Sequence, residues 1–204
     1  MRHVLLPTLG AAVAFLAGVS APSEAPPEFA PRDVHARADS LRGEVDRLEA
    51  ALARRAPRGA YLVVDRGNNR LWLRDGAGAR LEAVVSTGSG AILRESGGEG
   101  RSWTFDTPAG QLRVLAVRPS PVWVKPDWAF LEEGLQPPPG LAGRLERGSL
   151  GEWALDLGDG YMIHGTLYER LLGRSLTHGC IRVGRDDLRA VVEGVRPGTP
   201  VFIF

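Results

Sequence analysis

The chain has 204 residues, and its 25 lysine and arginine side chains nearly balance 24 aspartate and glutamate side chains, which leaves a formal net charge of +1. This balance excludes the strongly basic surface that nucleic-acid binding needs, so we expect no nucleic-acid partner. The single cysteine excludes a disulfide within the chain, and no phosphate-binding loop, dinucleotide fingerprint or metalloprotease helix motif is present.

Residues 1–25 have the composition of an export signal. Two basic residues precede an apolar, uncharged run from Val4 to Val19, and small residues follow it. This order is typical of a signal peptide, because the run is short for a helix that spans a membrane. Prolines beside the cleavage candidates support the alternative of an uncleaved N-terminal anchor, which would tether the protein through residues 4–19. In either case we expect an exported protein.

Residues 26–58 are predicted to form a linker and an amphipathic helix. The linker is rich in proline, alanine and glutamate, and the helix should run over residues 31–56, between Pro31 and Pro57. Apolar residues recur there at spacings of four and three, at Val34, Ala38, Leu41, Val45, Leu48 and Leu52. This heptad stripe indicates either helix-mediated self-association or packing of the helix on the domain that follows it. We favour the second, because the stripe is under three heptads long.

Residues 59–204 are predicted to form one mainly β domain, a mixed, sandwich-like fold with one or two short helices. Trp72 between Leu71 and Leu73 implies cover on both faces of its strand, as in a sandwich. Residues 87–102 are rich in glycine and serine and are predicted to be a loop. Strands are expected at 61–65, 70–74, 79–86, 111–117, 153–157, 161–163 and 201–204, and a helix at 186–195.

Residues 118–150 differ from the rest of this domain. They contain six prolines together with Trp123 and Trp128. Long irregular segments in compact domains often serve as lids or binding loops, which would make the two tryptophans a wall for substrate. A proline-rich cover over a sheet edge, with the tryptophans as core residues, is equally consistent with the pattern.

The chemistry is concentrated in the stretch from Thr177 to Val183, which holds Cys180, the only cysteine of the chain. Two of the four histidines, His164 and His178, lie close to it in sequence. A thiol becomes a nucleophile as the thiolate, and a neighbouring histidine can generate it. The alternatives are a buried structural cysteine, or a zinc site with the two histidines and Cys180 as ligands.

Two motifs in the order His-Gly-Thr, then Thr-His-Gly-Cys-Ile-Arg, resemble the signature of the L,D-transpeptidase family, which cross-links or trims bacterial peptidoglycan. The histidine and the cysteine are 180 − 164 = 16 positions apart, a gap that is similar to the family's. The resemblance extends over about residues 59–204, and further landmarks occur in the family's order. They are Tyr61–Asp65, Arg70–Arg74, Val85–Gly88, Thr107–Gly110 and Pro197–Val201.

The resemblance implies roles for the residues of the two motifs. Cys180 would be the nucleophile and His164 the general acid and base, with the Gly165 carbonyl orienting the imidazole ring. The backbone around Gly179 would stabilise the oxyanion. The residues implied in substrate binding are Thr177, His178, Arg182 and Trp123. No metal or cofactor is implied.

The resemblance also implies the reaction. The thiolate would attack the bond between the diamino acid and the terminal D-Ala of a peptidoglycan stem tetrapeptide and form an acyl-enzyme. An amine of a second stem peptide would release it as a 3–3 cross-link, whereas water would give L,D-carboxypeptidase activity and a protein amine would anchor a lipoprotein. The alternatives are another cysteine peptidase of the cell wall and a non-catalytic wall-binding module.

Arg182 has two interpretations that the sequence leaves open. Its planar guanidinium suits bidentate recognition of a substrate carboxylate, and it suits equally a salt bridge that fixes the loop. His178 is also a candidate base, because residues two apart on an extended strand point to the same face. The strand-like alternation that leads into His164, and the family's assignment, favour His164 as the base.

Overall fold

The computed structural model describes residues 31–55, 57–95, 97 and 100–204. The expected signal peptide or anchor, including residues 4–19, lies outside the described residues, as does the linker before residue 31. Helix α1 (Pro31–Arg55) confirms the expected helix, with Asp33 in its first turn and two arginines in its last, as the helix dipole favours. The expected packing of this helix on the catalytic domain stays a prediction. Within the described part of the chain, no helix is both long and apolar enough to cross a membrane.

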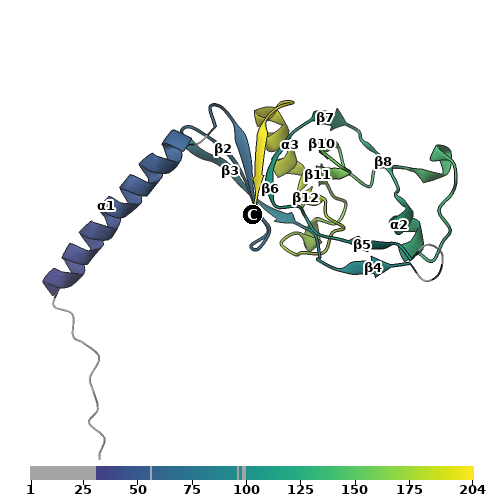
Figure 1. Ribbon diagram of the computed structural model, residues 1–204. Coiled ribbons are helices and arrows are strands. Elements are labelled where there is room, and N and C mark those ends of the chain that lie inside the picture. The colour runs from purple at the N-terminus through teal and green to yellow at the C-terminus, as the bar shows by residue number, and fades with distance from the viewer. Residues whose placement is uncertain (1–30, 56, 96, 98–99) are drawn as a thin grey trace, which may run out of the picture. The chain divides into compact units, whose positions relative to one another are not determined.

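A mixed sheet of nine strands forms the body of the domain (Figure 1). Two of its pairings are parallel, β1 with β13 and β11 with β12, and the others are antiparallel. In order across the sheet, the strands are β6 (Gly110–Arg113), β13 (Pro200–Ile203), β1 (Tyr61–Asp65), β2 (Arg70–Asp75), β3 (Gly78–Ser86), β12 (Ile181–Val183), β11 (Tyr161–Gly165), β10 (Trp153–Gly158) and β7 (Ala116–Pro119).

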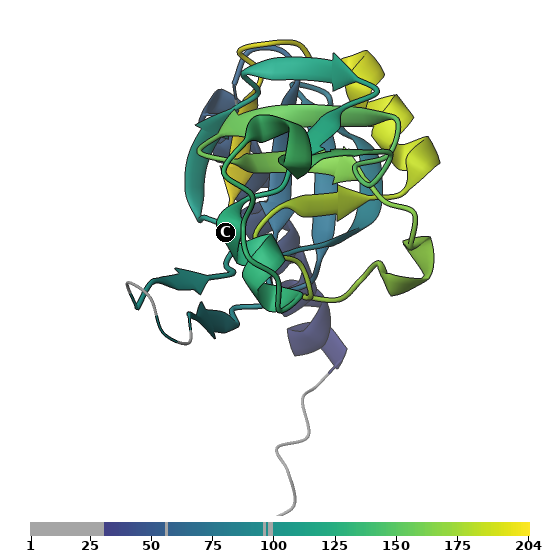
Figure 2. The same ribbon diagram turned by 90° about the vertical axis from the view of Figure 1, so that its right-hand side faces the viewer.

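The core lies between the two halves of this curled sheet. Fully buried side chains come from both halves, for example Leu62 and Leu71 from one and Leu155 and Ile163 from the other. Helix α3 (Arg185–Gly194) adds Leu188 and packs against β3, β10 and β11. Figure 2 shows this helix beside the strands. The sandwich-like, mainly β architecture expected from the sequence is therefore confirmed.

The prediction of one strand over residues 111–117 is wrong, because two separate strands occur there. Residues 110–113 form β6 and pair with β13, whereas residues 116–119 form β7 and pair with β10 at the opposite edge of the sheet. Val114 is fully buried at the crossing and Leu115 is 57% exposed. The apolar residues continue through residues 112–117 while the chain passes from one edge of the curled sheet to the other, so the sequence pattern alone does not reveal the break.

Two segments predicted to be irregular contain short elements. The loop over 87–102 includes the hairpin of β4 (Ile92–Arg94) and β5 (Ser102–Thr104). The segment 118–150 includes β8 (Val122–Val124), α2 (Asp127–Glu132), η1 (Leu141–Arg144) and β9 (Leu145–Arg147), where β8 and β9 pair. The β4–β5 hairpin and α2 lie at the same end of the domain (Figures 1 and 2).

Trp72 was expected to be covered on both faces of its strand. Leu71 and Leu73 point into the core and are buried, whereas Trp72 on the other face of β2 is only half-buried. One further short helix, η2 (Glu169–Leu171), lies in the connection between β11 and β12. This connection joins the two parallel strands that carry the candidate catalytic motifs.

Candidate active site

The His164 and Cys180 motifs meet because their strands are parallel neighbours. The register pairs Ile163 with Ile181 and His164 with Arg182. Both isoleucines point into the core and are buried, so His164 and Arg182 point to the opposite face. Cys180 lies two residues before Arg182, just ahead of β12, and lines the same cleft as both of them. The fold therefore brings the thiol, the imidazole and the guanidinium together.

The cleft that receives these side chains has a volume of about 1480 Å³. One wall comes from the 118–150 segment and the other from β11 and the loop before β12. Six of the side chains expected to act on substrate line it: Trp123, His164, Thr177, His178, Cys180 and Arg182. Trp123 and Trp128 are both half-buried with ring centroids 6.0 Å apart, so each belongs to the cleft wall and to the packing beneath it.

His164 is held as a neutral base by its surroundings. Its Nδ1 lies 2.6 Å from the carbonyl oxygen of Gly165, and because a carbonyl only accepts, Nδ1 carries the proton and Nε2 the lone pair. The residue is 5% exposed, and this burial lowers the pKa of His164 from 6.5 to about 4. The carbonyls of Gly165 and Leu150 oppose that shift in pKa, while the charge of Arg182 adds to it.

Cys180 is a free thiol that keeps part of its surface open to the cleft. Burial raises the pKa of the Cys180 thiol, against smaller opposing effects from the Met162 backbone and the Arg182 charge. Its Sγ lies 3.6 Å from the Gly160 carbonyl oxygen, which favours the protonated form. The resting pair is therefore a thiol and a neutral imidazole, and a thiolate has to form during the reaction by transfer of its proton.

Arg182 extends into the cleft and is half-buried. None of the salt bridges found in the described residues involves it. The interpretation of Arg182 as one half of a loop-fixing salt bridge therefore finds no support among the described residues. A guanidinium that faces a cleft and lacks a carboxylate partner remains available to an anionic ligand.

Gly179 is required by its backbone and by its neighbours. Its φ of +118° lies in a region that residues with a Cβ rarely adopt. A Cβ there would also lie 2.8 Å from the ring of Tyr161 and 2.9 Å from the Asp106 carbonyl oxygen. The bend at this residue means that 178–180 is not an extended strand, so the expectation that His178 and Cys180 point to the same face of one is wrong.

Thr177 braces the same bend from inside. Its Oγ1 donates to the Cys180 carbonyl oxygen at 2.6 Å and accepts from the Gly179 amide at 3.2 Å. The side chain is buried, so both contacts hold the loop in shape. The roles expected for Thr177 in substrate binding and for the Gly179 amide in oxyanion binding stay predictions. The second requires that amide to exchange its Thr177 partner for substrate.

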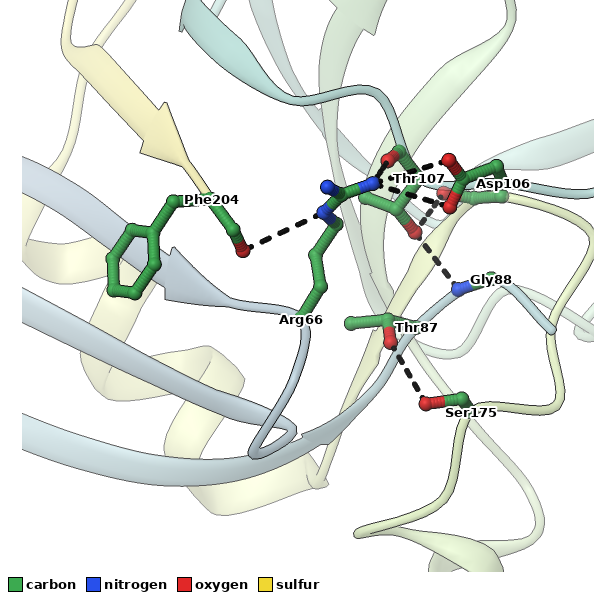
Figure 3. A network of polar contacts seen from close by, with 8 residues as sticks. Arg66, Thr87, Gly88, Asp106, Thr107, Ser175 and Phe204 are labelled. Carbon is green, nitrogen blue, oxygen red and sulfur yellow. Dashed lines mark hydrogen bonds and ion pairs between the residues drawn. The ribbon is translucent and has the colours of Figure 1, made fainter. Parts of the chain in front are cut away.

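Thr107 is a supporting residue whose role the sequence did not reveal (Figure 3). Its buried hydroxyl donates to the Gly179 carbonyl oxygen and accepts from the Gly88 amide, both at 2.8 Å. Arg66 in turn donates to the Thr107 carbonyl oxygen at 2.6 Å and pairs with the carboxylate of Asp106 at 3.1 Å. Thr107 starts a motif that resembles a family landmark, but its partner lies 72 positions away in sequence.

Asn69 is a second supporting residue, at the end of the turn between β1 and β2. It is buried with a φ of +53°, and its Oδ1 accepts from the amide and the hydroxyl of Thr87 at 3.1 and 2.9 Å. Its Nδ2 donates to Ser175 Oγ at 3.1 Å. The Thr87 carbonyl accepts from the amides of Leu176 and Thr177, so Asn69 fixes the start of the cysteine loop.

His178 makes its contacts with the 118–150 segment. Its Nε2 lies 2.8 Å from a carboxylate oxygen of Glu132, and its ring stacks on Trp128 at 4.3 Å. The Phe105 ring packs roughly perpendicular to the same ring, with centroids 4.5 Å apart. The zinc alternative finds no support, because the described residues include no group of three or more histidine, cysteine or acidic side chains placed to hold a metal ion.

Comparisons with known proteins agree with this geometry. The family model YkuD, described as the L,D-transpeptidase catalytic domain, matches residues 59–203. The fold is similar to that of the L,D-transpeptidase from Xylanimonas cellulosilytica DSM 15894, with a TM-score of 0.54 and 19% identity over 74% of this chain and 62% of that chain. The NMR structure of the catalytic domain from the E. faecium L,D-transpeptidase gives a TM-score of 0.51 and 20% identity over 72% of this chain and 98% of that chain.

The L,D-transpeptidase from Mycobacterium smegmatis is similar at a TM-score of 0.50 and 17% identity, over 71% of this chain and 58% of that chain. This chain therefore spans less than two thirds of the Xylanimonas and M. smegmatis chains. No protein of curated function matches it in sequence. At sequence identities of 17 to 20%, the similarity between these structures and this chain shows a shared fold and nothing further.

Proposed function

We propose a peptidoglycan acyl-transfer reaction from one premise: this chain belongs to the L,D-transpeptidase family, through a catalytic domain that covers residues 59–203. The family acts on peptidoglycan peptides. The proposal for this chain is that it cleaves a stem tetrapeptide between the diamino acid and the terminal D-Ala, and transfers the acyl group to an amine. The observation that carries it is the neutral His164 imidazole, buried beside Gly165 in the cleft that also holds Cys180.

In the first half-reaction, Nε2 of His164 takes the thiol proton while Cys180 Sγ attacks the carbonyl carbon of the diamino acid. The bond to D-Ala breaks as the imidazolium returns its proton to the departing amine, and a thioester remains on Cys180. The lowered pKa of His164 leaves the ring unprotonated at neutral pH, so it can accept the thiol proton, but it also makes the ring a weaker base in the resting site. The Gly165 carbonyl stabilises the imidazolium through the Nδ1 proton.

In the second half-reaction an acceptor amine attacks the thioester. The amine of a second stem peptide gives a 3–3 cross-link, water gives L,D-carboxypeptidase activity, and a protein amine anchors that protein to the wall. Backbone amides near Gly179 and Cys180 are the proposed oxyanion donors, a contribution worth about 3 kcal/mol for each donor. Arg182, with no carboxylate partner among the described residues, is the proposed contact for a substrate carboxylate, and Thr177, His178 and Trp123 complete the proposed pocket.

We assign the base to His164 and not to His178. The Nε2 of His178 donates to Glu132, and its ring is stacked on Trp128, so that nitrogen is directed away from a role as acceptor. For His164, the side-chain hydrogen bond found among the described residues is the one at Nδ1, and no comparable acidic partner is found there for Nε2. Both arguments support the assignment that the resemblance implies.

Export to the periplasm or cell wall is part of the proposal, because stem peptides are found there. The membrane tether through residues 4–19 and self-association through residues 31–56 stay predictions. The apolar stripe of α1 is exposed at Val34, Leu41, Val45 and Leu48.

The test is to incubate the purified protein with a stem tetrapeptide, with and without an acceptor amine, and to weigh the products. Loss of D-Ala with formation of a joined product supports the transpeptidase, and Cys180→Ala should abolish it while leaving the fold intact. Hydrolysis alone would identify a carboxypeptidase, and binding without cleavage a wall-binding module. His164→Gln should slow acylation of Cys180 by about 10² to 10⁴-fold, the usual contribution of a general base, and more than His178→Gln.

A further inference from the structure

The short helix α2 presents two side chains to the ring of His178. Trp128 and Glu132 are four residues apart and therefore lie on one face of the helix. Trp128 stacks on the ring at 4.3 Å with an interplanar angle of 21°, and Glu132 accepts from Nε2 at 2.8 Å. The Phe105 ring lies roughly perpendicular to this ring with centroids 4.5 Å apart, so the His178 ring is constrained in its plane and in its rotation.

The opposite end of α2 is fixed by ion pairs. Asp127, its first residue, accepts from Arg101 at 2.6 Å and from Arg144 at 2.7 Å, and these two contacts lower the pKa of Asp127. Arg101 lies just before β5 and also holds Glu95 through two contacts at 3.0 Å. The helix is therefore tied to the β4–β5 hairpin and to η1, so the position of Glu132 is set by segments outside the cysteine loop.

His178 is joined through Gly179 to the candidate nucleophile. A carboxylate oxygen can only accept, so the contact with Glu132 places a proton on Nε2 of His178. A ring fixed in tautomer and orientation holds the backbone before Gly179 in one arrangement. That arrangement includes the φ of +118° at Gly179 and the hydroxyl contact from Thr177 to Cys180.

We propose that Glu132 is a positioning residue for acylation, which acts through His178 to hold the cysteine loop in its reactive arrangement. This inference rests on the proposed function. It gives the 118–150 segment a role beyond that of a substrate wall, because α2 links the cleft wall to the loop that carries the nucleophile. The side chains of His178 and Glu132 are 29% and 47% exposed, so the pair adds little to folding stability and its effect should be on rate.

The experiment compares Glu132→Ala, Glu132→Gln and Glu133→Ala in the full chain. Glu133 is the matched control, because it is the next residue and pairs with Lys125 at 2.6 Å instead of with His178. The readout is the rate of Cys180 acylation by a carbapenem, followed by mass, with kcat and KM on a stem tetrapeptide. We expect Glu132→Ala to lower the acylation rate and kcat by about 10- to 100-fold with little change in KM, the scale expected for a misplaced reacting group.

Glu132→Gln keeps an oxygen that can accept from Nε2 and should restore most of the rate, whereas Glu133→Ala should match the wild type. In a His178→Gln background, Glu132→Ala should have no further effect, because both act through one ring. The ¹⁵N shifts of the His178 ring should report a proton on Nε2 in the wild type and in Glu133→Ala, and a mixture of tautomers in Glu132→Ala.

Normal acylation by Glu132→Ala, or an additive effect in the double variant, would overturn the positioning role. A rise in KM at unchanged kcat would also overturn it, since that result identifies a substrate contact. If the wild type itself is never acylated, the proposed function fails. In that case the ring measurement still decides whether Glu132 positions His178, and an unchanged tautomer in Glu132→Ala would refute it.

Discussion

Acidification should destabilise the catalytic domain through the imidazole of His164. Burial lowers its pKa from 6.5 to about 4, so the folded domain binds the proton less tightly than the unfolded chain does. As the pH falls through 6.5, the His164 imidazole becomes protonated in the unfolded state but stays neutral in the folded state. Its contribution to the free energy of unfolding is therefore fully present above pH 6.5, is lost as the pH falls towards 4, and levels off below that value.

The magnitude follows from this difference in pKa. At about 1.4 kcal/mol for each pKa unit, the free energy of unfolding should fall by about 3 kcal/mol in total because of this one group. Roughly 2 kcal/mol of that loss should occur between about pH 7.5 and pH 5. Urea denaturation followed by tryptophan fluorescence at several pH values measures it, and the denaturant slope shows whether unfolding stays two-state.

His164→Gln provides the comparison, because glutamine cannot take the proton. The variant will differ from the wild type in absolute stability, so the informative quantity is the dependence on pH. Its curve should be flatter than the wild-type curve by about 2 kcal/mol over that interval. Parallel curves would refute the reasoning.

In the wild type, kcat/KM should stay on its plateau as the pH falls through 6.5, since the base is still unprotonated.

Three further predictions concern the supports of the site and the N-terminal region. Thr107→Val should lower the free energy of unfolding by about 2 to 4 kcal/mol, because the Gly179 carbonyl and a buried amide both lose a partner; a loss below about 1 kcal/mol would argue against it. Gly151→Ala should cost more than Gly148→Ala in the same denaturation assay. Both positions have positive φ, but only at 151 would a Cβ lie 2.7 Å from a backbone carbon of β11, so equal losses would contradict this account. Removal of residues 1–56 should leave acylation by a soluble stem peptide unchanged, and a folded but inert remainder would show that the helix contributes to the site.

Local patterns in the sequence were sufficient for much of the fold. Alternation and turn residues predicted β1, β2 and β3, because each strand pairs with its neighbour in sequence. The heptad stripe predicted α1, and the helix expected at residues 186–195 is α3. The candidate catalytic pair could also be predicted, because the motifs around His164 and Cys180 are specific to one family. The parallel pairing that brings these two residues together became visible only in the structure.

Contacts between distant segments could not be read from the sequence. Asn69 looked like an ordinary turn residue, yet its amide holds Thr87 and Ser175, the second of which is 106 positions away. Glu132 is a half-exposed acidic residue in a proline-rich segment, and its meaning depends on His178 lying opposite it. Such roles produce no periodic pattern and no motif spacing in the sequence, because each role depends on a single polar contact between distant residues.

The position of β13 has a consequence for how the domain is made. Residues 200–203 lie between β1 and β6, and the amide of Phe204 next to them donates to Val64, far back in the chain. A chain that emerges from a ribosome or an export channel in N-to-C order has to carry β1 with the backbone amides and carbonyls of one edge unpaired until this segment arrives. Folding of the sheet is then a late event that depends on long-range pairing, which is slow and exposes the edge to aggregation in the meantime. A binding factor that shields nascent β1 would therefore be expected to raise the yield of the domain without altering its final fold.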